Sequence, residues 1–334
     1  MLQKSWKNKQ FSVSRVVVYI AFIALVAYLN LTTRGFGLDL IILFFGLLAL
    51  LSGRGKEFFK DWWPYLVLFW LYETARGFAD NIAQFLGRPI VVDGLLNLER
   101  AVFGFWSWLT GGAGPTVSGV IPTVWLQQHF LPSQMPMWFI YALFLVYTLF
   151  FWFWAFTGYV LWKQNKKLFH EYMQNLLIVS FIGVVFYALM PSAPPWYAAY
   201  LGKLPPLDRF LWSKTLPSSG ISLVHFWDQN YFAAFPSMHF AWPFLAVIYL
   251  TKVFGGFVKS GAISANGRVG RILVIFKKLA LYSLYLIPFA ICFAIVYGAE
   301  HYVVDCLMSV ILVLGVVWGR RVFRSVMGYF VKRV

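Results

Sequence analysis

The chain of 334 residues is too apolar and too poor in charge for a water-soluble globular protein. Hydrophobic residues make up 60% of it, aromatic residues 21% and charged residues only 12%, whereas soluble domains contain ~25% charged residues. This composition also excludes a disordered, collagen-like or coiled-coil chain. Two cysteines, Cys292 and Cys306, are too few for a disulfide framework or a cysteine-rich metal site. The net charge of +16 is compatible with binding to nucleic acid or anionic lipid, or with a bias in membrane orientation.

Eight apolar runs along the chain are candidates for membrane-spanning helices, because about 20 mainly apolar residues cross the hydrocarbon core of a bilayer. They predict an all-α integral membrane protein with about eight transmembrane helices. Two long insertions, Ala75–Pro136 and Pro191–Phe235, interrupt the series. The runs are Val16–Leu31, Leu38–Leu51, Trp62–Thr74, Met137–Trp162, Met173–Met190, Met238–Phe254, Ile272–Tyr297 and Tyr302–Trp318.

The basic residues divide unequally between the two sides that these spans define. With the N-terminus in the cytoplasm and the sides alternating, 21 of the 28 Lys and Arg residues fall in cytoplasmic segments. A bias spread over every loop is the positive-inside pattern of membrane proteins. The charge therefore indicates topology rather than nucleic-acid binding, which favours basic residues clustered on a soluble face. Both termini are expected in the cytoplasm and both insertions on the extracytoplasmic side.

Two of the five histidines begin predicted spans on the same side of the membrane. His239 lies in the motif Pro-Ser-Met-His at the start of the sixth span, and His301 lies in the motif His-Tyr-Val-Val-Asp at the start of the eighth. Their separation of 62 residues suits one span down, a basic cytoplasmic loop and one span back. Both imidazoles are therefore expected near the extracytoplasmic surface, where ionisable groups close to hydrocarbon are costly and usually functional.

The residues around these histidines suit phosphoryl transfer. Ser237 is a favourable N-cap, and the helix that follows offers free N–H groups and a positive dipole to a phosphate. Asp305 follows His301 by four residues, so the two are expected on one helical face, and an Asp beside a His fixes its tautomer. One imidazole is expected to attack phosphorus while the other protonates the leaving oxygen. The alternatives are an interfacial or capping role for each histidine and an ion pair of Asp305 with Arg76 or Arg100.

The two motifs resemble the second and third signatures, PSxH and HxxxD, of the type 2 phosphatidic acid phosphatase superfamily. The segments Leu96–Gly104 and Pro191–Tyr197 are similar to segments of the branch that contains fungal inositol phosphorylceramide synthase and its bacterial relatives. The resemblance covers roughly residues 70–320. It implies a six-helix core, a phosphohistidine intermediate, and neither a metal nor another cofactor.

The same resemblance implies residue roles and domain boundaries. His301 would be the nucleophile, Asp305 would orient it, and His239 would act as general acid and then as general base. The implied domains are residues 1–60, a cytoplasmic tail with two accessory transmembrane helices; 61–320, the six-helix catalytic membrane domain with extracytoplasmic loops; and 321–334, a basic cytoplasmic tail.

Two phosphate-binding cations of the superfamily's phosphatases have no counterpart here. Their first signature, K-x6-R-P, is nearest to the segment from Asn81 to Arg88 and Pro89, with Asn in place of Lys, and Ile295 stands where they carry an Arg. A monoester dianion needs more charge-assisted contacts than a monoanionic diester, so the deficit favours a phosphodiester substrate. Arg76, Arg88 and Asn81 are expected near the phosphate, with interfacial anchoring as the alternative for the cations.

An aromatic pair, Trp196 and Tyr197, is expected to cover the site. It follows three prolines (Pro191, Pro194 and Pro195) that stiffen the loop, because proline fixes the backbone angle φ. Anchoring at the membrane interface, where Trp and Tyr collect, is the alternative.

Three functions remain open from the sequence. The first is a membrane lipid phosphotransferase that moves a phosphorylated head group from a phospholipid donor to a hydroxylated lipid acceptor through a phosphohistidine, with its active site at the extracytoplasmic face. The second is a lipid phosphate phosphatase that acts on a phosphatidic acid or polyprenyl phosphate type of substrate. The third is a non-enzymatic transporter or scaffold, although no internal repeat is visible. The sequence favours the first, with membrane lipids and not nucleic acid as partners, and is silent on oligomeric state.

Overall fold

The computed structural model describes residues 38–109, 120–213, 230–263 and 267–331. It divides the chain into two compact units, Met1–Pro64 and Tyr65–Val334. In the first unit, α2 (Leu38–Leu51) is followed by the beginning of α3 (Gly55–Gly77), and the Phe58 and Trp62 rings of α3 stack at 4.9 Å. The second unit holds the remainder of α3 and all the helices that follow.

Five helical segments among the described residues are long and apolar enough to cross a membrane. They correspond to the last five of the eight expected runs, and the protein is an all-α, multi-pass membrane protein. Of the other runs, Val16–Leu31 lies outside the described residues, Leu38–Leu51 is the 14-residue α2, and Trp62–Thr74 lies within α3. The five segments are Met137–Gln164, Lys166–Leu189, Met238–Gly255, Val274–Tyr297 and Val303–Phe323.

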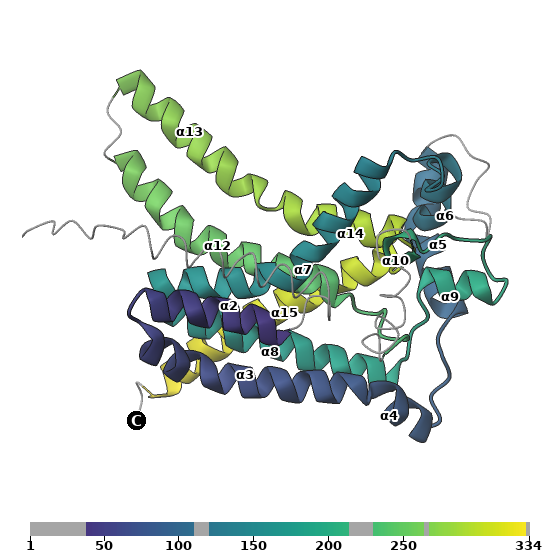
Figure 1. The fold of residues 1–334 in the computed structure, drawn as a ribbon, viewed down its shortest axis with the longest axis horizontal. Helices are drawn as coiled ribbons and strands as arrows, with labels where there is room; N and C mark the ends of the chain where they lie inside the picture. Colours follow the sequence, from purple (N-terminus) through teal and green to yellow (C-terminus); the bar gives the residue numbers. More distant parts are fainter. Residues whose placement is uncertain (1–37, 110–119, 214–229, 264–266, 332–334) are drawn as a thin grey trace, which may run out of the picture. The chain divides into compact units, whose positions relative to one another are not determined.

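The helix α12 (Met238–Ile263) lies at the centre of the second unit. It packs against α7 (Met137–Gln164), α8 (Lys166–Leu189), α13 (Gly267–Ser283), α14 (Leu286–Tyr297) and α15 (Val303–Val331), as Figure 1 shows. Because α12 touches five neighbours, its side chains are buried on most sides. The apolar core between α7, α12 and α14 includes Ile140, Leu143, Tyr147, Phe240, Ile291 and Ile295.

A single residue, Asn165, separates α7 from α8. Its amide N–H donates to the Leu161 carbonyl at 2.7 Å, which ends α7. Its side-chain oxygen accepts the N–H of Leu168 at 3.0 Å, which caps the start of α8. So short a connection makes the two helices antiparallel neighbours, and both their far ends lie toward the insertions.

The two insertions form short helices. The first contains α4 (Ala79–Phe85), α5 (Asp93–Leu109) and α6 (Pro122–His129). The second contains α9 (Pro195–Tyr200) and α10 (Phe210–Ser213). Pro122 and Pro195 each stand in the first turn of their helix, where the missing N–H costs nothing.

Backbone and side-chain hydrogen bonds join the two insertions to each other. Ser192 forms isolated parallel bridges with Val91 on one side and Ala233 on the other. The Gln127 side chain donates to the Asp208 carbonyl at 2.9 Å and accepts the Asp208 N–H at 2.8 Å. The insertions therefore form one polar layer at the end of the helices where α12 and α15 begin.

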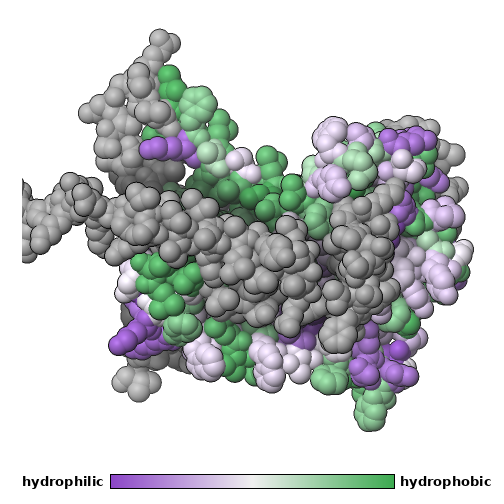
Figure 2. Space-filling view, in the orientation of Figure 1, coloured by the Kyte–Doolittle hydropathy of each residue, from purple (hydrophilic) through white to green (hydrophobic). Residues whose placement is uncertain are grey.

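Large apolar side chains are exposed along α13 (Gly267–Ser283). In water such a surface favours association or aggregation, but it suits contact with lipid. Figure 2 shows hydrophobic side chains along the described part of this helix and hydrophilic ones over the end where α5, α6 and α9 lie. The exposed residues of α13 include Ile272, Ile275, Phe276, Leu279 and Tyr282.

Candidate functional site

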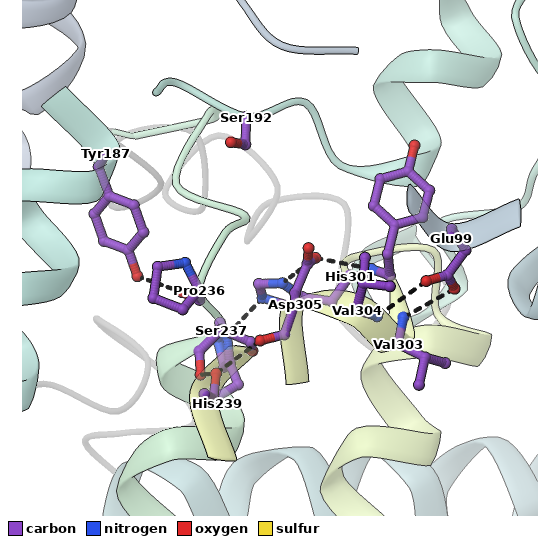
Figure 3. A network of polar contacts seen from close by, with 12 residues as sticks. Glu99, Tyr187, Ser192, Pro236, Ser237, His239, His301, Val303, Val304 and Asp305 are labelled. Carbon is purple, nitrogen blue, oxygen red and sulfur yellow. Dashed lines mark hydrogen bonds and ion pairs between the residues drawn. The ribbon is translucent and has the colours of Figure 1, made fainter. Parts of the chain in front are cut away.

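The segment before α12 brings His239 to the site. Ser237 precedes the helix and His239 is its second residue. The Tyr187 hydroxyl of α8 donates to the Pro236 carbonyl at 2.9 Å, and the Ser237 N–H donates to the Asp305 carbonyl at 3.2 Å. The start of α12 is therefore held from α8 on one side and from α15 on the other (Figure 3).

The start of α15 places a carboxylate beside the second histidine. Asp305 is fully buried, and its Oδ2 atom lies 3.1 Å from Nδ1 of His301 and accepts the N–H of Tyr302 at 2.8 Å. His301 lies in the turn two residues before Val303, where α15 begins. The pair is thus brought together by this turn and the first turn of the helix, and not by a shared helical face as the spacing predicted.

The two histidines are in direct contact. Nδ1 of His239 lies 3.1 Å from Nε2 of His301, and Nε2 of His239 lies 3.3 Å from the Tyr147 hydroxyl. With Asp305 ionised, one set of protons satisfies every contact. His301 donates from Nδ1 to Asp305, His239 donates from Nδ1 to His301, and Tyr147 donates to His239. This assignment leaves the lone pair of His301 on Nε2, facing His239.

Two polar atoms at the site are buried without a hydrogen-bond partner among the described residues. They are the Ser237 hydroxyl and the Oδ1 atom of Asp305. The Ser237 hydroxyl therefore does not cap α12, although the sequence predicted that it would. A buried hydroxyl without a partner is costly, and that of Ser237 can bind an oxygen of an incoming group.

The turn before His301 is tied to the second insertion. Gly298 admits no side chain, because a Cβ atom there would lie 2.9 Å from a backbone carbonyl of α14, and Ala299 adopts a positive φ of 60°. Arg209 makes two hydrogen bonds to the Glu300 carboxylate, at 2.6 and 2.8 Å, and lies over the Trp196 ring at 4.5 Å. The backbone N–H of Trp196 donates to the Ala299 carbonyl at 3.1 Å.

Of the predicted aromatic pair, Trp196 therefore lies against the turn before His301. Trp196 contacts this turn through its backbone N–H. Tyr197 packs edge-to-face on Phe232, with 5.1 Å between the ring centroids. Arg209 was not expected at the site from the sequence. A basic residue in a loop carries no local sign of the ion pair that it makes 91 residues further on.

Arg76 is a predicted cation that interacts electrostatically with His239. It lies in the last turn of α3 and binds the Glu73 carboxylate through Nε at 3.1 Å and Nη2 at 2.8 Å. Burial alone would lower the pKa of the Arg76 guanidinium, but the charge of Glu73 raises it above its ordinary value. Its positive charge acts on Tyr187 and on His239.

Asn81 and Arg88 are exposed, on α4 and just after it. Within the described part of the chain, neither has a hydrogen bond or ion pair to the histidines. Arg100 lines a cavity of about 310 Å³ together with Gln128 and Lys203, and this cavity does not reach the histidine pair.

Glu99 and Tyr147 contact the site but were not predicted from the sequence as site residues. Glu99 of α5 is fully buried, and its two oxygens accept the N–H groups of Val303 at 3.0 Å and Val304 at 2.9 Å. Tyr147 belongs to an aromatic-rich span in which lipid contact explains most rings. Neither residue lies near a histidine in the sequence, so no spacing rule identifies them.

Comparison with known proteins finds similarity to one family. Residues 118–266 match the model of the PAP2 superfamily, a segment that contains His239 and ends before His301. Over 237 residues the chain is 26% identical to the phosphoinositol dihydroceramide synthase of Bacteroides thetaiotaomicron. The alignment covers 66% of this chain and 64% of that relative, so the chain spans less than two thirds of the relative's length. No solved structure matches the chain significantly.

These two matches confirm the resemblance of the chain to the PAP2 superfamily and to its branch of inositol phosphorylceramide synthase relatives.

Proposed function

We propose that this protein is a membrane enzyme that transfers a phosphorylated head group from a phospholipid to the hydroxyl of another lipid. The observation that supports this most directly is the 3.1 Å contact between His301 Nε2 and His239 Nδ1, with Asp305 behind His301. One ring presents a lone pair and the other a proton. A displacement at phosphorus needs such a pair of groups.

In the first step, the Nε2 lone pair of His301 attacks the phosphorus of the donor. For this step His239 is doubly protonated, with its second proton on Nε2 facing Tyr147, because the negative charge of the phosphate favours the imidazolium. The N–P bond forms, the bond from phosphorus to the donor's glycerol oxygen breaks, and the Nδ1 proton of His239 passes to that oxygen, which leaves His239 neutral. Asp305 stabilises the positive charge that develops on the His301 ring. The two rings must move apart for this step, because a phosphorus atom does not fit between nitrogens 3.1 Å apart.

In the second step, the acceptor lipid's hydroxyl attacks the phosphorus bound to His301. His239, now neutral with its remaining proton on Nε2, takes the hydroxyl proton on Nδ1 while the new O–P bond forms and the N–P bond breaks. Tyr147 keeps its contact with Nε2 of His239 in both steps, so the same nitrogen of His239, Nδ1, releases and recovers the proton.

The groups available to bind the phosphate suit a monoanionic diester. The start of α12 offers backbone N–H groups and the Ser237 hydroxyl, and Arg76 supplies one positive charge that Glu73 already partly offsets. Arg88 is exposed and has no contact with the histidine pair among the described residues. A dianionic monoester would find few cations here.

The name of the Bacteroides relative indicates which lipids to test first. A phospholipid with a phosphoinositol head group is the proposed donor, and a dihydroceramide-type lipid with a free primary hydroxyl is the proposed acceptor. Both are amphipathic, so a site at the end of membrane-spanning helices allows the polar groups to react while the chains stay in lipid.

The test is a transfer assay with the purified full chain in mixed micelles of labelled phosphatidylinositol and dihydroceramide. We expect His301→Ala and His239→Ala to lower turnover by at least ~10²-fold each, because both proton transfer and covalent catalysis are lost or impaired. His129→Ala is the matched control and should keep wild-type turnover, since His129 is exposed on α6 and, among the described residues, its ring contacts only the carbonyl and ring of Trp125 on the same helix.

Two outcomes would contradict the proposal. Wild-type turnover in the His301 and His239 variants would remove both residues from the reaction. Release of inorganic phosphate from phosphatidic acid, at a rate that an acceptor lipid does not change, would identify a phosphatase instead.

A further inference from the structure

The Glu99 carboxylate, which belongs to α5, binds backbone N–H groups at the start of α15. It reaches from α5 and places one oxygen on the Val303 N–H and the other on the Val304 N–H, at 3.0 and 2.9 Å (Figure 3). The side chain is fully buried. More than 200 residues separate Glu99 from this helix start, so the contact is purely tertiary.

Three successive N–H groups at the start of α15 are thereby bound to carboxylates. The Tyr302 N–H donates to Asp305, and those of Val303 and Val304 donate to Glu99. The first N–H groups of a helix have no partner within the helix and are a common anion site. Here the protein fills that site itself, so this helix end serves to anchor α15 and the start of α12 remains for the phosphate.

Two carboxylates at one helix end carry a cost. Burial raises the pKa of Glu99 to about 7, the N–H groups of Val304 and Val303 lower it, and the charge of Asp305 raises it further. The other charged or titratable groups nearby are Tyr302, just before α15, and Arg100 on α5 itself. A carboxylate placed at such a cost is not explained by stability alone.

We propose that Glu99 is a positioning residue, which holds the first turn of α15 so that Asp305 and His301 keep their alignment toward His239. The inference rests on the proposed function. His301 is two residues before Val303 and Asp305 is one residue after Val304, so the two N–H groups that Glu99 binds lie between the reacting histidine and its partner. A shift of about 1 Å at the first turn is enough to lower the rate ~10²-fold.

Kinetics separate positioning from a general structural role. We expect Glu99→Gln to lower kcat by about 10- to 100-fold with KM within about twofold of wild type, because the substrate does not touch Glu99 and only the transition state depends on alignment. The amide of Gln keeps one acceptor and turns an NH2 group toward the second N–H. Glu99→Asp keeps both oxygens on a shorter side chain and should recover part of kcat.

The matched control is Glu171→Gln. Glu171 is a largely buried glutamate of α8 whose carboxylate accepts the Tyr249 hydroxyl at 2.7 Å and lies 3.5 Å from Nζ of Lys252, away from the histidines. The same chemical change there should leave kcat at the wild-type value.

A second measurement does not depend on activity. Amide hydrogen exchange of the full chain in detergent, followed in peptides that contain residues 302–304, should be about fivefold faster in Glu99→Gln than in wild type, since a hydrogen bond of ~1 kcal/mol is lost. Glu171→Gln should leave this exchange unchanged. If Glu99→Gln fails to fold, the Asp variant supports the same comparison, with a smaller effect.

The two proposals fail in different ways. Wild-type turnover in His301→Ala removes the proposed function, while exchange at residues 302–304 still tests the anchor. Unchanged kcat and unchanged exchange in Glu99→Gln overturn the positioning role, and so does a fall in kcat that the Glu171 control shares.

Discussion

A continuous chain of hydrogen bonds joins four side chains, in the order Tyr147, His239, His301 and Asp305. Because the Asp305 carboxylate at one end can only accept, it decides which atom donates in each of these bonds. Three of the four side chains were predicted as site residues from two short motifs, because the spacing within each motif is local. Tyr147 was not, since its partner lies 92 residues away and its own surroundings are aromatic. The nitrogen that each histidine uses is decided by this chain of contacts alone.

Glu99 makes the stability of the protein depend on pH. Its pKa is about 7 in the folded protein against an ordinary 4.5. A carboxyl group whose pKa is raised on folding stabilises the fold most below its unfolded pKa, and this contribution is lost as pH rises through the folded value. Between about pH 4.5 and pH 8 the loss amounts to ~3 kcal/mol at most, at 1.36 kcal/mol per pKa unit.

The change that isolates this effect is again Glu99→Gln, which does not titrate. We expect the Tm of the wild type in detergent to fall relative to that of Glu99→Gln as the pH is raised from 5 to 8. Thermal unfolding at several pH values, in one detergent and at constant ionic strength, measures the difference. A Tm difference that does not change over this range would show that Glu99 does not titrate there.

Hydrogen bonds join the starts of the two helices α12 and α15. Besides the bond from the Ser237 N–H to the Asp305 carbonyl, the Ser309 hydroxyl lies 2.7 Å from the Ser237 carbonyl and 2.8 Å from that of Asp305. Ser309 is fully buried, and its single proton is shared between these two acceptors. The start of α12, which carries His239, is thus hydrogen-bonded directly to α15, the helix that follows His301.

Removing this hydroxyl should loosen the contact without exposing a new polar group. Both carbonyls keep another partner, the Ala241 N–H for Ser237 and the Ser237 N–H for Asp305. We therefore expect Ser309→Ala to cost ~1 kcal/mol, the net value of one hydrogen bond, seen as a lower Tm.

Ser325→Ala is the control for this change, because Ser325 is exposed on the same helix and, within the described part of the chain, donates to the Arg321 carbonyl alone. It should leave Tm unchanged. An equal loss in both variants would mean that Ser309 contributes through helix propensity and not through the link to α12.

The elements themselves could be predicted well in the second half of the chain. All five of the last apolar runs correspond to helices, because a span is recognised from the length and apolarity of a local stretch. What could not be predicted is that His301 precedes the helix that holds Asp305. His301 was expected inside a helix, and it lies in a turn that Gly298 and a positive φ at Ala299 create.

For the whole molecule, the distribution of basic residues predicts which ends of the helices face the cytoplasm. The connection of α7 to α8 carries lysines on both sides of Asn165, whereas α9 and the turn after it belong to the polar layer near the histidines. The positive-inside bias puts the first in the cytoplasm and the second outside it.

Cysteine labelling tests this topology. In a background with Cys292→Ala and Cys306→Ala, Gln164→Cys and Tyr200→Cys each place one thiol at an exposed position. We expect a membrane-impermeant maleimide to label the Tyr200 variant in intact cells and the Gln164 variant only after permeabilisation. The opposite pattern would reverse the orientation and move the histidines to the cytoplasmic face.

The amino-acid sequence alone determined the all-α membrane class, five of the spans and the pairing of His239 with the His301–Asp305 motif. Each of these depends on a local property, such as the length of an apolar run or a spacing of four residues. The tertiary structure decided that Glu99 anchors α15, that Tyr147 contacts His239 and that Arg209 holds the turn before His301. These contacts join residues about 90 to 205 positions apart. Hydrogen bonds are made by groups that are close in space, and no pattern along the chain indicates which distant groups the fold will bring within hydrogen-bond distance.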